Sequence, residues 1–285
     1  MSPSAIPKMV LLNAHEYFNT RGLTTTGRLV EEVVTRSVSS GRLSDFMPQV
    51  PVIMSALEAE YSTNACRTEL FKQQGTLFNQ ARLASAGSVE SAALDLDLSD
   101  EFQGFNMYYV NQLMNVYTNQ MEDFFQSQVD TTFNSSHSPI ILETGRARFL
   151  RLCLSYLLLC ESMFDQMVAF NYKLLRVAGR AVPSGTPPRS PSGFARALRS
   201  EGYDKLVDGF SSVLRNGIGH AHIKIETGGN FTISDPQDST STPITMNYQQ
   251  MKTEYYDKLT GVLNLWDLFI VMNTLERFAR EELRP

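Results

Sequence analysis

The fold class is decided by the stretch FLRLCLSYLLLC, residues 149–160, which is apolar on nearly every side of a helix. Its apolar side chains recur at helical spacing, inside a long helix predicted over 143–180. Arg151 and Glu161 lie in or beside the run, which is far shorter than the ~20 apolar residues that a membrane span needs. A helix of this kind is buried by its neighbours. We therefore expect it at the centre of a bundle, in a cytoplasmic protein that makes no membrane contact.

Helical periodicity covers most of the remaining chain. The predicted helices lie at 8–85, 105–133 and 247–283, and a shorter one leads from about residue 194 or 203 to residue 214. The proline-rich segment 183–193 predicts a loop. An acidic run with small residues at 88–104 predicts a connector. We therefore divide the chain into an N-terminal helical region, 1–100, and a second helical domain, 101–285.

The periodicity changes from helical to alternating after residue 221. Residues 222–226 and 231–234 alternate between apolar and polar side chains, and Gly228-Gly229-Asn230 between them is typical of a tight turn. This pattern predicts a small β-hairpin. The predicted fold class is mainly α: a helical bundle with one hairpin after residue 221, plus the N-terminal helical region.

The overall charge excludes a generally basic nucleic-acid coat protein. The chain has 285 residues, a hydrophobic share of 42%, a charged share of 19% and a net charge of −5, which are typical of a globular protein. Residues 166–224 nevertheless carry nine basic and three acidic side chains, a local net charge of +6. Such a region suits a phosphate backbone, although an ordinary solvated face has the same composition.

No metal site or cofactor motif is predicted. The cysteines Cys66, Cys153 and Cys160 are too few and too scattered for a disulfide framework or a cysteine-based zinc site. The sequence contains neither a phosphate-binding glycine loop nor a zinc-protease motif. We therefore expect chemistry that uses side chains alone.

The candidate catalytic residues lie in Leu214-Arg215-Asn216-Gly217-Ile218-Gly219-His220-Ala221-His222, between the short helix and the hairpin. Arg215 keeps its charge at neutral pH, whereas a histidine such as His220 takes or gives a proton there. An arginine and a histidine together can cleave RNA without a metal, by activating a 2′-hydroxyl and stabilising the charge that develops on the phosphate. An arginine followed by a histidine at this spacing is expected about once by chance in a chain of this composition. The candidate site therefore depends also on Asn216 and on the order of helix, motif, hairpin and helix along the chain.

Arg215-Asn216-x-x-x-His220 resembles the R-N-x-x-x-H form of the Arg-x(4–6)-His signature of the HEPN superfamily. This superfamily of helical bundles includes many prokaryotic ribonuclease toxins and phage-defence effectors. The resemblance covers roughly residues 105–285 and leaves 1–100 unassigned.

The resemblance implies a metal-independent endoribonuclease without a cofactor, acting as a toxin or anti-phage effector. Arg215 would hold the scissile phosphate, His220 would act as general base or acid, and Asn216 would orient the histidine or the phosphate. Attack by the 2′-hydroxyl would leave a 2′,3′-cyclic phosphate and a 5′-hydroxyl. Family members pair two motifs across a dimer, so the implied partners are RNA and a second copy of the chain. Residues 1–100 could contact a further protein.

Two points about the pair stay open in the sequence. His222 also fits the broad signature and is an auxiliary candidate, although His220 matches the narrower form. Side chains five residues apart on a helix point about 140° from each other. Arg215 and His220 can therefore meet only if Gly217 and Gly219 break the helix, or if a second copy supplies one of them.

A non-catalytic interpretation is the alternative. Arg215 and Asn216 would then lie at the end of a helix that stops at Gly217, and His220 would be an ordinary turn residue. The chain would be a HEPN-like binding or assembly module that contacts a protein partner or a nucleotide ligand.

Overall fold

The structure of the chain is a computed structural model that describes residues 5–85, 144–179, 188–226 and 228–283. The chain divides into two compact units. Among the described residues, the first unit comprises 5–85, 177–179 and 265–283, and the second comprises 144–176, 188–226 and 228–264. The predicted connector at 88–104, the predicted helix at 105–133 and the predicted boundary at residue 100 lie outside the described residues.

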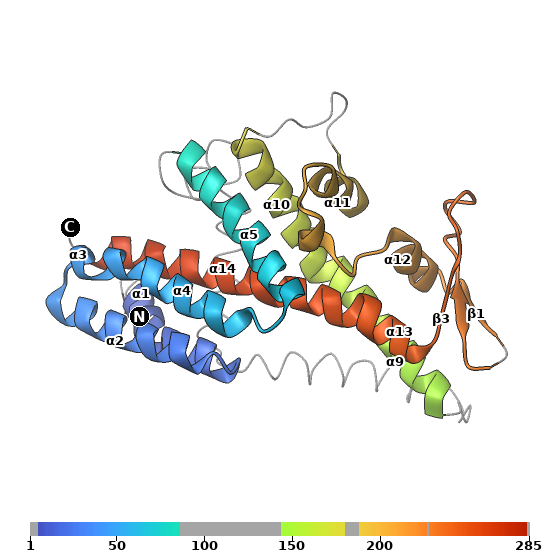
Figure 1. The fold of residues 1–285 in the computed structure, drawn as a ribbon, viewed down its shortest axis with the longest axis horizontal. Helices are drawn as coiled ribbons and strands as arrows, with labels where there is room; N and C mark the ends of the chain where they lie inside the picture. The colour runs from blue at the N-terminus through green and yellow to red at the C-terminus, as the bar shows by residue number, and fades with distance from the viewer. Residues whose placement is uncertain (1–4, 86–143, 180–187, 227, 284–285) are drawn as a thin grey trace. The chain divides into compact units, whose positions relative to one another are not determined.

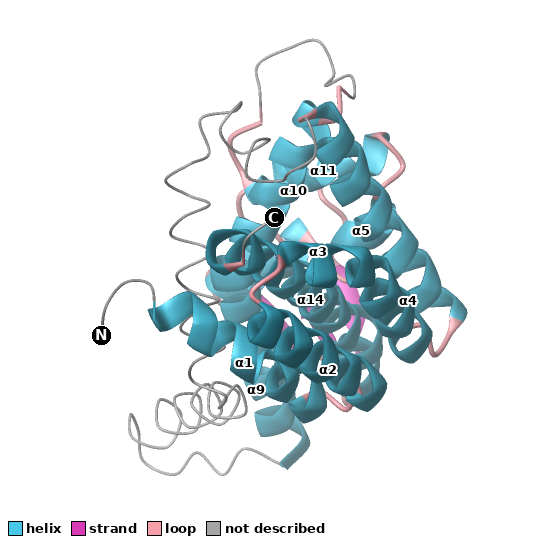
Figure 2. Cartoon of the chain, turned by 90° about the vertical axis from the view of Figure 1, so that its left-hand side faces the viewer, coloured by secondary structure: helices cyan, strands magenta, loops and turns pink. Residues whose placement is uncertain are grey.

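The first unit is built from helices. In chain order these are α1 (Ala5–Thr20), α2 (Thr24–Ser40), α3 (Leu43–Phe46), the 3-10 turn η1 (Met47–Gln49), α4 (Val50–Tyr61), α5 (Ala65–Ala84) and the C-terminal part of α14 (Asp257–Glu282). Figure 1 shows α1 to α5 in blue to cyan, and in Figure 2 the C-terminal part of α14 lies among α1, α2, α4 and α5. These helices lie largely within the predicted helical segments 8–85 and 247–283.

The C-terminal part of α14 supplies core residues to the first unit. Trp266 and Phe269 of this helix are buried, as is Phe18 of α1. Full burial of a side chain of this size contributes about 1.5–3 kcal/mol. From residue 265 onward the last helix therefore groups with the N-terminal helices, whereas the sequence analysis assigned all of 247–283 to the second domain.

The start of α2 is capped by a side chain from another helix. Leu23 precedes α2, and its side chain accepts no hydrogen bond from the first backbone N–H groups of the helix. Glu60 of α4 instead accepts from the N–H groups of Thr25 and Thr26, each at 2.8 Å, and from the Thr26 hydroxyl at 2.7 Å. Burial raises the pKa of Glu60, but these hydrogen bonds outweigh burial and lower the pKa below its ordinary value. The carboxylate thus satisfies donors that the open end of a helix leaves unpaired.

The second unit confirms the prediction of a mainly α fold. Its helical elements are α9 (Thr144–Leu159), the π-helical turn η2 (Cys160–Phe164), α10 (Asp165–Val177), α11 (Pro191–Ser200), the 3-10 turn η3 (Asp204–Val207), α12 (Ser212–Gly219), α13 (Tyr248–Gln250), the π-helical segment η4 (Met251–Tyr256) and the start of α14. The elements from α9 to α10 form one continuous helical run over 144–177, close to the bounds predicted from periodicity.

The run Arg148–Val177 is the one described helix that is long and apolar enough to cross a membrane, by length and composition alone. Helices in the core of a soluble protein meet the same criterion. Phe149, Tyr156 and Phe164 along this run are buried, whereas Leu158 is 37% exposed. Of the most apolar 18-residue window of this run, 39% is buried.

Two predictions for the segment that precedes the motif in sequence are wrong. The loop over 183–193 ends earlier than expected, because Pro191 takes the first position of α11, where proline is well tolerated, and Ser190 caps that helix. The single helix predicted to lead into the motif is instead divided into α11, η3 and α12. Gly202 and Gly209 interrupt it by adopting positive φ angles of 85° and 79°.

Three short strands follow the motif. β1 (Ile223–Ile225), β2 (Phe231–Ile233) and β3 (Ile244–Met246) form an antiparallel sheet in the order β1-β2-β3. Phe231 of β2 stacks on Phe149 of α9 with ring centroids 3.6 Å apart, and this contact attaches the sheet to the helices. The sequence predicts no third strand, although β3 has the same length as β1 and β2.

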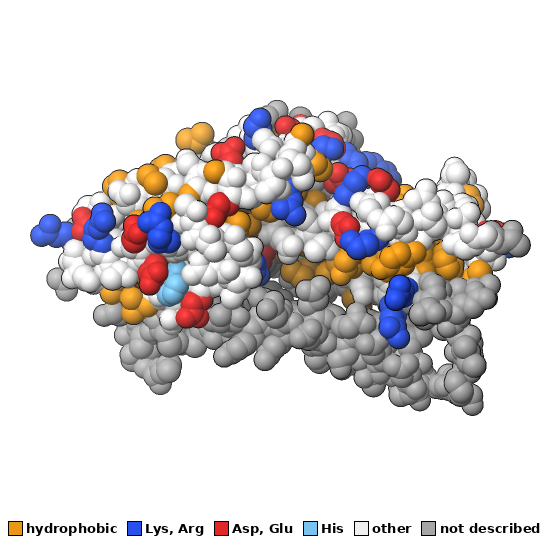
Figure 3. Space-filling view, turned by 60° about the horizontal axis from the view of Figure 1, so that its bottom comes forward, with side chains coloured by type: hydrophobic (Ala, Val, Ile, Leu, Met, Phe, Trp, Pro, Cys, Tyr) orange, Lys and Arg blue, Asp and Glu red, His pale blue; other side chains and the backbone are white. Residues whose placement is uncertain are grey.

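The described surface carries both signs of charge. On the face shown in Figure 3, Lys and Arg side chains are interspersed with Asp and Glu side chains. Among the described residues, this face therefore presents no broad basic surface, in keeping with the net charge of −5.

Candidate functional site

Arg215 and Asn216 lie on α12, a helix of eight residues, and His220 is the C-cap residue that follows it. The hydroxyl of Ser211 caps its start by accepting from the backbone N–H of Leu214 at 3.3 Å. Leu214 and Ile218 are buried and hold the helix against the second unit. Arg215 and Asn216 are half-buried at the edge of this buried face, so both side chains reach solvent.

The glycines of the motif do not break the helix, which corrects one of the two routes considered from the sequence. Gly217 and Gly219 both lie within α12, and neither has a positive φ angle. Gly217 instead permits close packing: a Cβ there would lie 2.4 Å from Ile233 Cγ2 and 2.6 Å from the carbonyl oxygen of Ser234. Glycine is needed at this position because β2 packs too close to the helix to leave room for a side chain.

The helix ends at Gly219 rather than at Gly217, contrary to the alternative interpretation, and His220 and Ala221 follow it. Ala221 has a φ angle of 56°, the left-handed conformation that glycine usually supplies. Its backbone N–H donates to the carbonyl of Ile218 at 3.1 Å, and that of His222 donates to the carbonyl of Gly217 at 2.7 Å. These two hydrogen bonds form a Schellman motif, which turns the chain from α12 into β1.

Arg215 forms a two-point ion pair with Glu161 of η2. Its Nε and one terminal nitrogen donate to the two carboxylate oxygens at 2.7 Å and 3.1 Å. The side chains of Arg215 and Glu161 are 26% and 50% exposed, so the pair faces solvent. Burial raises the pKa of Asp165, with the charge of Arg215 opposing this effect and that of Glu161 adding to it. The surroundings of Arg215 are therefore acidic.

Asn216 contacts the segment that follows β2. Its amide nitrogen donates to Asp235 Oδ2 at 2.8 Å, and the other oxygen of that carboxylate accepts from the backbone N–H of Gln237 at 2.8 Å. Asp235 is only 8% exposed. Because an amide nitrogen can only donate, the buried carboxylate fixes which way the Asn216 side chain points.

His220 contacts the same segment. Its Nε2 lies 2.9 Å from the amide nitrogen of Gln237. Since that nitrogen donates, Nε2 accepts, and the proton of the neutral ring lies on Nδ1. The imidazole is exposed. His222, just before β1, is also exposed, and its side chain makes no hydrogen bond or ion pair with the described residues.

The structure therefore groups the predicted residues in two sets. Asn216 and His220, four positions apart and so on one side of the helix, both contact residues 235–237. Arg215 contacts Glu161 and shares no partner with His220. His220 is the C-cap residue after α12, and at helical spacing two side chains five residues apart point about 140° from each other. A break of the helix at its glycines, which is one of the two routes to a joint site, is absent from α12.

Sequence reasoning missed the three residues that hold the motif. Glu161 follows the apolar helical run as the first charged residue, and Asp235 and Gln237 flank a proline just after β2. Only the fold brings them beside α12. Among the described residues, no group of His, Cys, Asp or Glu side chains is arranged to hold a metal ion. Comparison of the chain with protein families, characterised proteins and solved structures gives no match.

Proposed function

We propose that this protein is a metal-independent endoribonuclease of HEPN-like architecture, whose active site is completed by a second copy of the chain. The observation that supports the proposal is the arrangement of the motif on α12. Arg215, Asn216 and His220 all reach the surface, and each is oriented by a neighbouring side chain, Glu161, Asp235 or Gln237. Oriented side chains are what such catalysis requires, because misplacement by 1 Å can cost a hundredfold in rate.

The proposed reaction is an internal transesterification of RNA. His220 Nε2 takes the proton of a ribose 2′-hydroxyl, and the 2′-oxygen forms a bond to the adjacent phosphorus. The bond from phosphorus to the 5′-oxygen breaks, and that oxygen takes a proton from a second imidazole or from water. Arg215 stabilises the negative charge on the phosphate oxygens during the step. The products are a 2′,3′-cyclic phosphate and a 5′-hydroxyl.

A second copy is part of the proposal because α12 is continuous. Two-fold symmetry would bring Arg215 of one copy toward the partner's His220. The substrate must also displace two contacts that these side chains make in the structure. The 2′-hydroxyl replaces the Gln237 amide at Nε2, and phosphate competes with Glu161 for the guanidinium.

The test is cleavage of RNA by the purified chain and its variants. We expect Arg215→Ala and His220→Ala each to lose at least about a hundredfold in rate. His15→Ala and Arg28→Ala, which remove a histidine and an arginine outside the motif, are the matched controls and should cleave normally. EDTA should have no effect, and end-group analysis should find cyclic phosphate. Full activity in either motif variant would overturn the proposal.

Mixing the two inactive variants tests the shared site. A mixed dimer of Arg215→Ala and His220→Ala chains holds one site with both groups intact, so cleavage should return when the two proteins are combined. Mixtures that stay inactive, although the chains exchange, would show that the site is not shared. In cells, a toxin or anti-phage role predicts that expression arrests growth and that either motif substitution relieves the arrest.

The acidic surroundings of Arg215 favour a second candidate function, a non-catalytic HEPN-like module that binds a protein or a nucleotide ligand. Glu161 neutralises the guanidinium, and Asp165 adds a further negative charge nearby. If this function is correct, the folded protein cleaves no RNA, and Arg215→Ala weakens partner binding instead.

A further inference from the structure

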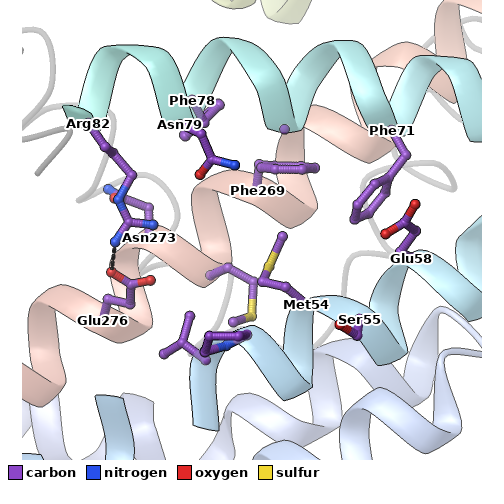
Figure 4. Close-up of a pocket in the computed structure, with 14 residues that line it drawn as sticks. Met54, Ser55, Glu58, Phe71, Phe78, Asn79, Arg82, Phe269, Asn273 and Glu276 are labelled. Atoms are coloured by element: carbon purple, nitrogen blue, oxygen red, sulfur yellow. Dashed lines mark hydrogen bonds and ion pairs between the residues drawn. The ribbon is translucent and has the colours of Figure 1, made fainter. Parts of the chain in front are cut away.

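The first unit contains a cavity of about 400 Å³ between α4, α5 and the C-terminal part of α14. This volume lies in the range of small-molecule sites in proteins, about 300–1,000 Å³. Its middle is apolar. Phe269 of α14 packs against Phe71 and Phe78 of α5 with centroid distances of 5.2 Å and 5.3 Å, and Met54 of α4 faces them (Figure 4).

The cavity is left open by a glycine in the middle of α5. Gly75 lines it, although glycine is the least favourable residue in a helix interior after proline. A Cβ at Gly75 would meet only Phe269, at ordinary van der Waals distances of 3.6 Å and 3.8 Å. No close approach of another chain segment therefore requires this glycine. Its effect is to keep space in front of the Phe269 ring.

The charged groups of the cavity lie at its two ends. At one end, Arg82 pairs with Glu276, whose side chain is 7% exposed, so the charge of the arginine is neutralised. At the other end, Glu58 lies beside the Phe71 ring, as Figure 4 shows, and its carboxylate has no hydrogen bond or ion pair with the described residues. One arginine and two glutamates leave the lining with a net charge of −1. An anionic ligand is disfavoured, and Glu58 is available to a cation or a hydrogen-bond donor.

We propose that this cavity binds a small aromatic molecule that carries a protonated amine. The ring lies among Phe71, Phe78 and Phe269, and the ammonium group pairs with Glu58. Aromatic rings stack at offset or edge-to-face geometry, and a cation beside the face of a phenylalanine gains further attraction from its ring electrons. This site is separate from the motif on α12 and does not depend on the nuclease proposal.

Calorimetric titration of the full chain with three matched indoles tests the proposal. Tryptamine carries the ammonium group, tryptophol replaces it with a hydroxyl, and indole-3-propionate replaces it with a carboxylate. We expect saturable binding of tryptamine at least tenfold tighter than that of tryptophol, with indole-3-propionate weakest. Tryptamine should also raise the melting temperature. Absence of saturable tryptamine binding, or equal affinity for all three, would overturn the proposal.

Variants locate the binding. Gly75→Leu fills the cavity and should weaken tryptamine binding at least tenfold, whereas Glu58→Gln should bring its affinity to within about threefold of tryptophol. Glu31→Gln, an acidic side chain exposed on α2, is the matched control and should leave binding unchanged. If Gly75→Leu does not fold, Glu58→Lys at its half-buried position reverses the charge without filling the cavity, and should favour indole-3-propionate. Unchanged tryptamine binding in the Glu58 variants would place the ligand elsewhere and refute the site.

Discussion

Gly217 of α12 lies against Ile233 of β2 so closely that a Cβ on the glycine would be 2.4 Å from Ile233 Cγ2. This contact between α12 and β2 is thus possible only because residue 217 has no side-chain methyl group. The contact sets how β2 lies on the helix that carries Arg215, Asn216 and His220. It also links the motif to Asp235 and Gln237, which follow β2 directly.

Gly217→Ala should destabilise the protein by about 1–3 kcal/mol, because the new methyl group overpacks the contact with Ile233 and Ser234. Gly219→Ala is the matched control. A Cβ at Gly219 would meet only Leu157 at 3.7 Å, and alanine favours the helix, so stability should stay equal or rise by up to about 1 kcal/mol. Urea unfolding of both variants measures the difference. Equal stability would show that α12 and β2 do not approach this closely.

Ala221→Gly should stabilise the protein by about 1 kcal/mol, since glycine adopts the φ angle of 56° without the steric cost that alanine bears. Thermal unfolding measures the change. Ala169→Gly, inside α10, should act in the opposite direction by a similar amount, because glycine weakens a helix interior. A destabilising effect of Ala221→Gly would argue against the left-handed end of α12.

Glu161→Gln should improve RNA binding by the proposed nuclease. The amide keeps the shape of the side chain but removes the charge that competes with phosphate for Arg215. A partly exposed ion pair of this kind contributes about 0.2–1 kcal/mol, so KM for RNA should fall by a factor of about 1.4 to 5. Glu32→Gln removes the acidic partner of Arg28 in the exposed pair on α2 and serves as the control. An unchanged KM would indicate that Arg215 does not contact the substrate.

Glu60→Gln should reduce stability at neutral pH by about 1 kcal/mol, as loss of a helix cap does. The hydrogen bonds from Thr25 and Thr26 lower the pKa of Glu60 from its ordinary value of 4.5. A lowered pKa in the folded state means that the carboxylate stabilises the protein above about pH 4.5, and that this contribution is lost as the pH falls through the folded pKa. Melting temperatures of the two proteins should therefore differ at pH 7 and converge toward pH 3. A constant difference across this range would contradict the cap.

Periodicity predicted the helical elements well because it records which side chains are buried. The run 149–160 and the last helix have strong apolar patterns, and both form helices near the predicted bounds. Periodicity does not report which neighbours a face packs against. Nothing in the spacing of α14 indicates that Trp266 belongs to the core of the first unit while Leu259 belongs to the second.

The sequence singles out candidate motif residues, but it does not show what surrounds them. The basic count over 166–224 suggested a site suited to phosphate. The fold brings Glu161 and Asp165 beside Arg215, and both precede that window by a few residues. Likewise, the sequence offers a helix break at Gly217 as one of two alternatives, whereas glycine there serves close packing. Alanine at position 221 gives no signal of a left-handed turn.

The division of α14 between the two units bears on how the chain matures. The helices before residue 86 cannot shield their apolar faces until residues 265–283 have emerged from the ribosome, because Trp266 and Phe269 lie there. The second unit interrupts the first in sequence, so no single cut yields both units whole. A chain shortened before residue 265 would leave the N-terminal helices with exposed hydrophobic surface, prone to aggregation, even where the motif-bearing unit is intact.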